Sequence, residues 1–126
     1  MRYLLDSTVL IDHARADEGA VAVLRRLFED GHEVLTCDVV TCETLSAGPP
    51  EELGHIEVLL DALEYVSTTP AAARRAAASR HTGRIAGGRR SLGDALIAGI
   101  AMDQAATVVT RNRPDFARQG VPVLEY

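Results

Sequence analysis

Short apolar runs alternate with stretches of helical periodicity along the whole chain. Five runs rich in β-branched or large apolar residues predict strands: Tyr3–Leu5, Val34–Cys37, Tyr65–Ser67, Thr107–Thr110 and Val121–Leu124. The apolar spacing of the segments between them predicts helices over Ser7–Ala16, Gly19–Asp30, Val39–Gly48 and Pro49–Leu63, with Asp38 as the N-cap of the third. A further helix should begin at Pro70 and end at Gly87–Gly88. Ser91 should cap the last one.

Strands separated by helices require parallel crossover connections, and a parallel sheet is covered on both faces. The pattern therefore predicts an α/β fold, a three-layer α/β/α sandwich with a central, mainly parallel sheet. The helix after Ser91 should be mostly buried, whereas the helix after Pro70 has few large apolar residues and should pack thinly. A chain of 126 residues has the size of one compact domain, so we expect a single domain over 1–126.

No segment suits a bilayer or an export signal. The longest uncharged apolar run, Ala95–Met102, is far shorter than the roughly 20 residues that a membrane span requires. Asp6 interrupts the apolar residues near the N-terminus, which argues against a signal peptide. We therefore expect a cytoplasmic protein that does not contact a membrane. Its two cysteines, Cys37 and Cys42, should then be reduced thiols.

The charge is divided unevenly along the chain. All 13 basic residues are arginine, which excludes chemistry that needs a P-loop, Schiff-base or kinase lysine. The segment from Ser67 to Gly93 holds six arginines and no carboxylate, although the net charge of the chain is −5. An acidic body with a basic segment can bind cations in one place and phosphates in another. A merely solvated helix would explain the same segment.

Acidic and amide side chains follow the predicted strands. Asp6 comes directly after the first strand, and Glu43 lies in the helix after the second. Asp94 lies in the first turn of a later helix, and Asn112 and Asp115 follow the strand that ends at position 110. Each could simply favour a helix N-terminus. However, the carboxyl ends of parallel strands share one edge of a sheet, so we expect these groups to converge there.

Converging carboxylates repel each other unless a cation neutralises them. An all-oxygen cluster without a supporting cysteine or histidine suits Mg²⁺ or Mn²⁺. Such an ion can activate water and stabilise a leaving oxyanion, and the basic segment can attract the rest of a polyanion. The combination predicts a metal-dependent nuclease.

Four blocks in order resemble the PIN-domain family: LLDSTVLID, TCETLSAG, SLGDALIAGIA and TRNRPDFARQGVPVLEY. Their spacing and the total length are similar to those of VapC toxins from bacterial toxin–antitoxin pairs, over essentially the whole chain. The resemblance implies that Asp6, Glu43 and Asp94 are the metal-binding acids, with Asp115 completing the quartet. Many PIN domains place an acid where Asn112 stands, so Asn112 and Asp115 compete for the fourth position.

The resemblance also implies roles for neighbouring residues. Ser7 or Thr8, together with Thr110, match the hydroxyl groups that surround the metal in this family. Arg89 and Arg90 lie just before Asp94 in the sequence, and we expect one of them to contact a phosphate of the substrate. Arg80 and Arg84, one helical turn apart, could follow the backbone further out.

The function implied is that of a Mg²⁺- or Mn²⁺-dependent endoribonuclease, the toxin of a type II VapBC system, which cuts structured RNA such as tRNA or rRNA to stop translation. A homodimer and a cognate VapB antitoxin are implied as well. The alternative is a non-catalytic PIN-like module that binds RNA or protein. A flap nuclease would need insertions for which the chain has no room. A haloacid-dehalogenase-like phosphatase would need an aspartate at position 8, where the chain has Thr8.

Overall fold

A single parallel sheet forms the centre of the computed structural model, which describes all 126 residues. Its strands lie in the order β3-β2-β1-β4-β5, and every neighbouring pair is parallel. Their bounds are β1 (Arg2–Leu5), β2 (Glu33–Cys37), β3 (Glu64–Val66), β4 (Thr107–Thr110) and β5 (Val123–Glu125). The predicted α/β class and central parallel sheet are confirmed.

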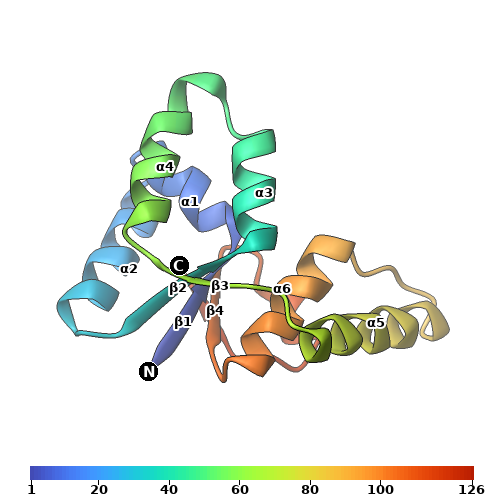
Figure 1. Ribbon diagram of the computed structural model, residues 1–126. Coiled ribbons are helices and arrows are strands. Elements are labelled where there is room, and N and C mark those ends of the chain that lie inside the picture. Colours follow the sequence, from blue (N-terminus) through green and yellow to red (C-terminus); the bar gives the residue numbers. More distant parts are fainter.

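Seven α-helices and one short 3₁₀ helix connect the strands. They are α1 (Ser7–Ala14), α2 (Glu18–Glu29), α3 (Asp38–Ala47), η1 (Pro50–Glu52), α4 (Leu53–Asp61), α5 (Pro70–Ile85), α6 (Leu92–Asp103) and α7 (Arg113–Ala117). In Figure 1, α1, α2 and α4 lie on one side of the sheet and α5 and α6 on the other. The helices α1 to α4 pack against one another, and α6 packs against both α5 and α7. The predicted three layers are therefore present.

The core forms where the sheet meets the apolar faces of these helices. Leu4 and Leu5 of β1 are completely buried, as is Ile97 of α6. The amphipathic segment predicted from position 49 to 63 buries the four residues that were expected to face inward: Ile56, Leu59, Leu60 and Leu63. The structure divides that segment into η1 and α4, because it begins with Pro49 and Pro50 and the first turn has 3₁₀ geometry.

Helix α5 forms an arm that extends away from the body of the molecule (Figure 1). Its only buried residues are Ala72, Ala76 and Gly83, as the scarcity of large apolar residues predicts. The arm is held by its close packing on α6. A Cβ atom built on Gly99 of α6 would lie less than 3.0 Å from the backbone carbonyl oxygen of Ala72. Glycine at this position lets the two helix backbones approach each other.

Two local expectations were wrong. Asp38 is the first residue of α3 and not its N-cap, a position taken by Cys37. The Asp38 carboxylate instead accepts hydrogen bonds from the backbone N–H and the hydroxyl of Thr68, at 3.2 and 2.9 Å, and so fastens the segment after β3. The last strand begins at Val123, two residues later than expected, since Val121 is buried in the turn that precedes it. No helix has the length and apolar character needed to cross a bilayer.

Candidate functional site

The strand order places the switch point of the sheet at the carboxyl ends of β1 and β4. From β1 the chain proceeds outward to β2 and β3 on one side, and β4 and β5 lie on the other. The connections from the two middle strands run toward opposite edges of the sheet. Open parallel sheets bind ligands at the point where the connections diverge. Asp6 directly follows β1, and Thr110 is the last residue of β4. The Asp6 N–H donates to the carbonyl oxygen of Val109 at 2.9 Å, so the two strand ends are joined at this point.

The Asp6 carboxylate is buried and held by three donors. Its Oδ1 accepts from the backbone N–H of Ser7 at 2.8 Å. Its Oδ2 accepts from the hydroxyls of Thr8 at 3.1 Å and Thr110 at 2.9 Å. Burial raises the pKa of Asp6 despite these hydrogen bonds, and the negative charge of Glu43 raises it further. A buried aspartate that is costly to ionise therefore lies at the switch point of the sheet.

Glu43 reaches the same place from α3. The Ser7 hydroxyl donates to its Oε1 at 2.6 Å, so Ser7 connects Asp6 through its backbone and Glu43 through its side chain. On the other side, Glu43 lies against Gly93 in the first turn of α6. A Cβ atom at Gly93 would come within 3.0 Å of Glu43 Oε2. The missing side chain at position 93 makes room for the carboxylate of Glu43.

Asp94 enters the site from the first turn of α6. Its backbone N–H donates to the Ser91 hydroxyl at 3.1 Å, which confirms Ser91 as the predicted helix cap. Burial raises the pKa of Asp94, and the charge of Asp6 raises it further, followed by a smaller contribution from Asp115. Asp6 and Asp115 are therefore close enough to Asp94 for their negative charges to affect it.

Asn112 and Asp115 lie on either side of the start of α7. The Asn112 N–H donates to the Thr110 hydroxyl at 2.9 Å, and its side chain is exposed. Asp115 Oδ1 accepts from the Arg118 guanidinium at 2.8 Å, one turn along the chain. Asp115 is thus both paired with an arginine and close enough to Asp94 to affect its pKa. Asn112 and Asp115 therefore both remain candidates for the fourth position.

The donor set suits a hard divalent cation, because it consists of carboxylate and hydroxyl oxygens only. The pKa values of Asp6 and Asp94 are raised first by burial and then by neighbouring carboxylates, and a bound cation would offset both effects. In this conformation no three acidic, histidine or cysteine side chains are arranged to hold one ion. Binding of one ion by three of these groups would therefore require their side chains to rearrange.

A second polar group supports the site and was not among the predicted residues. Asp12 is buried in α1, where its Oδ1 accepts from Arg111 at 3.1 Å and its Oδ2 from the Tyr126 hydroxyl at 2.7 Å. The Arg111 N–H also lies 3.5 Å from the Thr8 hydroxyl. This group fastens the segment after β4 to α1. An aspartate inside the apolar run VLIDHA was the sequence signal that could have revealed it.

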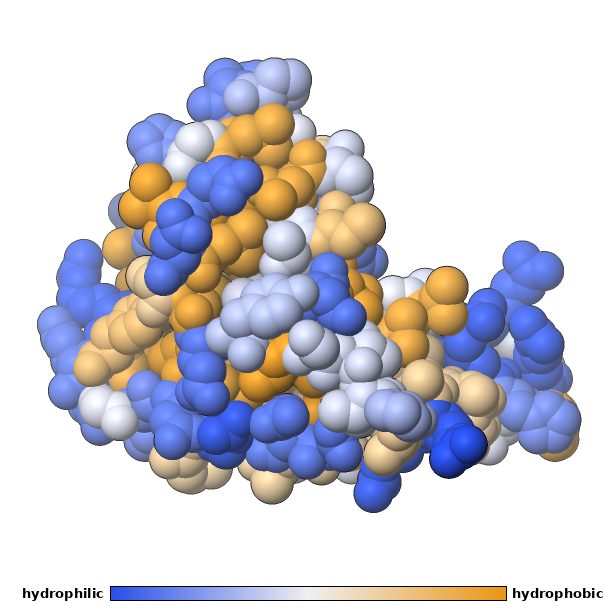
Figure 2. Space-filling model, viewed as in Figure 1, coloured by the Kyte–Doolittle hydropathy of each residue, from blue (hydrophilic) through white to orange (hydrophobic).

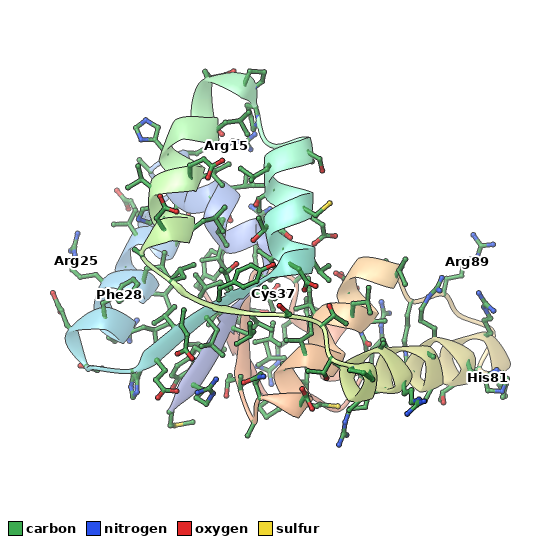
Figure 3. All side chains as sticks on the ribbon, in the orientation of Figure 1. Arg15, Arg25, Phe28, Cys37, His81 and Arg89 are labelled. Carbon is green, nitrogen blue, oxygen red and sulfur yellow. The ribbon has the colours of Figure 1, made fainter.

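The two arginines predicted to contact a phosphate differ in their surroundings. Arg89 is exposed in the loop between α5 and α6 (Figure 3). Arg90 folds back onto α5, where its Nη1 donates to the carbonyl oxygen of Ser79 at 2.8 Å and to the Ser79 hydroxyl at 2.9 Å. Its Nη2 donates to the carbonyl oxygen of Arg118 at 3.4 Å. Arg90 therefore holds the loop in place, which leaves Arg89 better able to reach a ligand.

The fold and the site together define a doubly wound, all-parallel α/β protein with an acidic, oxygen-lined centre at its switch point. The profile described as the PIN domain matches residues 3–121, so this chain belongs to the PIN-domain family. The predicted membership is thereby confirmed.

Relatives of known name or structure agree with this assignment. Ribonuclease VapC19 of Mycobacterium tuberculosis is 29% identical over 111 residues, which cover 86% of this chain and 87% of the relative. A chain of VapBC2 from Rickettsia felis, solved with a promoter DNA fragment, superposes with a TM-score of 0.86 at 19% identity, covering 100% of this chain and 99% of the other. A chain of DNA-bound VapBC from Salmonella typhimurium gives a TM-score of 0.83 at 20% identity, with coverages of 99% and 98%. The two structures share the fold of this chain.

Proposed function

We propose that this protein is a metal-dependent endoribonuclease, the toxin of a type II VapBC pair, and that it forms one PIN domain over residues 1–126. The observation that carries the proposal is that Asp6, at the carboxyl end of β1, is joined to Glu43 through Ser7 and is electrostatically coupled to Asp94 of α6. The pKa values of Asp6 and Asp94 are raised there by burial and by neighbouring negative charge. The name of the mycobacterial relative, a ribonuclease, supports the same activity.

In this proposal Asp6, Glu43, Asp94 and Asp115 hold Mg²⁺ or Mn²⁺, with Asn112 as the alternative to Asp115. A divalent ion at such a site lowers the pKa of water and stabilises charge that develops on a phosphodiester. The hydroxyls of Thr8 and Thr110 fix one oxygen of Asp6, and Ser7 fixes Glu43. The chain's own contribution is therefore to orient the carboxylates before any substrate arrives.

The partners follow from the same proposal. The substrate is a structured RNA, tRNA or rRNA, whose cleavage would stop translation. A VapB-type antitoxin would inhibit the enzyme, and a homodimer is the expected assembly. The structural relatives from Rickettsia felis and Salmonella typhimurium are described as VapBC with bound DNA, which supports the antitoxin partner. Light scattering of the purified chain, alone and with the antitoxin, would measure both assemblies.

Cleavage of total bacterial RNA tests the proposed activity. Purified protein is incubated with RNA in Mg²⁺, in Mn²⁺ and in EDTA, beside the variants Asp94→Asn and Asp61→Asn. Asp61 lies exposed on α4, so its replacement changes the charge equally but leaves the site intact. Discrete fragments should require both a metal and Asp94, and Asp61→Asn should cut like the wild type. Equal cleavage by Asp94→Asn in clean preparations would contradict the assignment of the site.

A second candidate function is a PIN-like module that binds RNA or protein without cutting. The observation in its favour is that no three acidic side chains are arranged for one ion in this conformation. Thermal unfolding with and without Mn²⁺ distinguishes the two candidates. A divalent ion that binds the folded state raises the Tm of the wild type, and Asp94→Asn should abolish that rise. RNA binding without cleavage and without a metal-induced rise would favour the module.

A further inference from the structure

A groove with a charge opposite to that of the acidic site lies between α5 and the N-terminus of α6. It has a volume of about 640 Å³ and is lined by Arg80, Arg84, Arg89, Arg90 and Ser91, without a single hydrophobic residue. In Figure 2 hydrophilic residues gather at the tip of this arm, whereas apolar residues are exposed over part of the body. A hollow formed almost entirely by guanidinium groups is suited to an anion with several charges.

No acidic side chain neutralises the groove. The segment from Ser67 to Gly93 contains no carboxylate, and Arg80, Arg84 and Arg89 take part in none of the five ion pairs of the protein. Arg84 and Arg89 are exposed, and Arg80 is half-buried. Four positive charges around one hollow repel each other, so the arrangement favours binding of a polyanion.

Arg90 holds the groove in shape. Its guanidinium is fastened to Ser79 of α5 and to the carbonyl oxygen of Arg118. Its backbone carbonyl oxygen accepts from Arg80 Nε at 3.2 Å, which leaves the terminal nitrogens of Arg80 available. The side chain of Arg90 also lies against Gly83, where a Cβ atom would be only 3.2 Å from its Cγ. The groove is therefore organised before a ligand binds.

The groove adjoins the acidic site. Ser91 lines the groove and also caps α6, and Asp94 follows three residues later, about 5 Å along the helix axis. The N-terminus of this 12-residue helix adds its own positive potential between the two sites. In Figure 3, Arg89 extends from the α5–α6 loop on the side of the arm where α3 lies. A strand that is cut at the acidic site would thus meet the arginines within a few nucleotides.

We propose that the groove of Arg80, Arg84 and Arg89 binds successive backbone phosphates of the RNA beside the cut site. The inference rests on the proposed ribonuclease function and adds the place where the substrate is held. An acidic peptide is a poorer fit, because no hydrophobic side chain lines the groove to contact its other residues. Phosphate contacts fix the register of a nucleic acid without reading its sequence. The groove would accordingly supply affinity and register, and not base specificity.

Binding and cleavage of RNA by the double variant Arg84→Gln/Arg89→Gln would test this proposal. The matched control is Arg25→Gln, an exposed arginine of α2 at the opposite end of the molecule (Figure 3). Binding is measured by fluorescence anisotropy with a labelled, single-stranded 20-nucleotide RNA, in EDTA, over a series of salt concentrations. Each lost phosphate contact lowers the slope of log K against log salt by about 0.7, so two contacts predict about 1.4 and roughly a 25-fold weaker affinity at 0.1 M salt.

The outcomes separate this proposal from the ribonuclease activity. A large loss of affinity in the arginine variant, with Arg25→Gln close to the wild type, supports the groove whether or not the RNA is cut. Equal affinities and salt slopes in the two variants would overturn it, even if the wild type proves to be a nuclease. If the double variant instead keeps its RNA affinity and loses binding to poly-glutamate, the groove belongs to an acidic protein partner and the proposal is wrong. Unchanged thermal unfolding of both variants would confirm that they fold.

Discussion

Gly93 lies in the first turn of α6, against the carboxylate of Glu43. A methyl group at this position would collide with Glu43 Oε2, which is the mobile end of a long side chain. The collision is relieved when the carboxylate moves and the backbone stays in place. One residue without a side chain thus decides where Glu43 lies, although it carries no chemistry of its own.

The variant Gly93→Ala should therefore separate activity from stability. Alanine favours the helix over glycine by up to about 1 kcal/mol, so we expect an unchanged or higher free energy of unfolding. We expect kcat/KM for RNA to fall by about 100-fold, because displacement of a catalytic group by roughly 1 Å has an effect of that size. Chemical unfolding and initial cleavage rates measure the two quantities. Wild-type cleavage by this variant would show that the position of Glu43 is unimportant.

The pKa of Asp94 predicts how its replacement changes stability with pH. Burial and the charge of Asp6 raise this pKa above its ordinary value of 3.8, so the folded state binds the proton more tightly than the unfolded state. The ionised carboxylate therefore destabilises the fold at neutral pH, and this penalty disappears as the pH falls through the raised pKa toward 3.8. Asp94→Asn should be more stable than the wild type at pH 7 in EDTA, and the difference should vanish near pH 4.

Urea unfolding at several pH values, always in EDTA, measures this difference. The exposed Asp61→Asn serves as the control, and its free energy of unfolding should stay within about 0.5 kcal/mol of the wild type. A stability difference between Asp94→Asn and the wild type that is the same at every pH would mean that folding does not shift the pKa of Asp94. The charge repulsion inferred at the site would then be absent.

At the scale of elements, the packing of α5 on α6 depends on a second glycine of the same helix. A Cβ atom at Gly99 would meet the backbone carbonyl oxygen of Ala72, which cannot move without the helix that carries it. We expect Gly99→Ala to lower the free energy of unfolding by about 1–3 kcal/mol, in spite of the better helix propensity of alanine. A thermal scan against Gly54→Ala in α4, where nothing lies within 4 Å of the new methyl group, provides the comparison. Equal effects of the two substitutions would contradict the close approach of α5 and α6.

The elements themselves could be predicted from the sequence, because periodicity and capping residues act locally. Ser91 caps α6 as expected, and the apolar stripe of α4 is buried. Asp38 was misassigned because its partner, Thr68, lies 30 residues away and belongs to another element. The order of the strands was not predicted either, since spacing along the chain implies parallel crossovers but not which strands become neighbours.

In the site, too, the features set by local sequence could be predicted and those set by distant contacts could not. The position of Asp6 after the first strand was enough to place it at the carboxyl edge of the sheet, and the charges of Glu43 and Asp6 affect the pKa values of Asp6 and Asp94, respectively. The contacts of Arg90 with α5 could not be foreseen, because they depend on the path of the loop after Gly87. The buried group around Asp12 was missed for a similar reason, since its partners are about 100 residues distant.

At the scale of the whole molecule, the two charged regions occupy adjoining positions. The net charge of −5 combines an acidic body with a basic arm, and Figure 2 shows the hydrophilic arm standing apart from the body. A polyanion approaching the body alone would be repelled, whereas the arm attracts it over distances near the Debye length, about 8–10 Å in physiological salt. Because the arm and the acidic site adjoin at the N-terminus of α6, attraction by the arm would bring the proposed RNA substrate to the carboxylates.

A hydrogen bond between Tyr126 and α1 joins distant parts of the chain. Its removal measures how much this contact contributes to the free energy of unfolding. The Tyr126 hydroxyl donates to Asp12 across 114 residues of sequence, and Asp12 is 5% exposed. Burial and this hydrogen bond raise the pKa of Tyr126, so the donor stays protonated at physiological pH.

Tyr126→Phe leaves a buried carboxylate oxygen without its donor, and we expect a loss of about 1–3 kcal/mol in the free energy of unfolding. Chemical unfolding beside Tyr65→Phe, which removes the hydroxyl of a tyrosine that is 56% exposed, isolates the effect of the buried bond. If both substitutions change stability by less than about 0.5 kcal/mol, as surface changes usually do, then Arg111 alone is sufficient to hold Asp12.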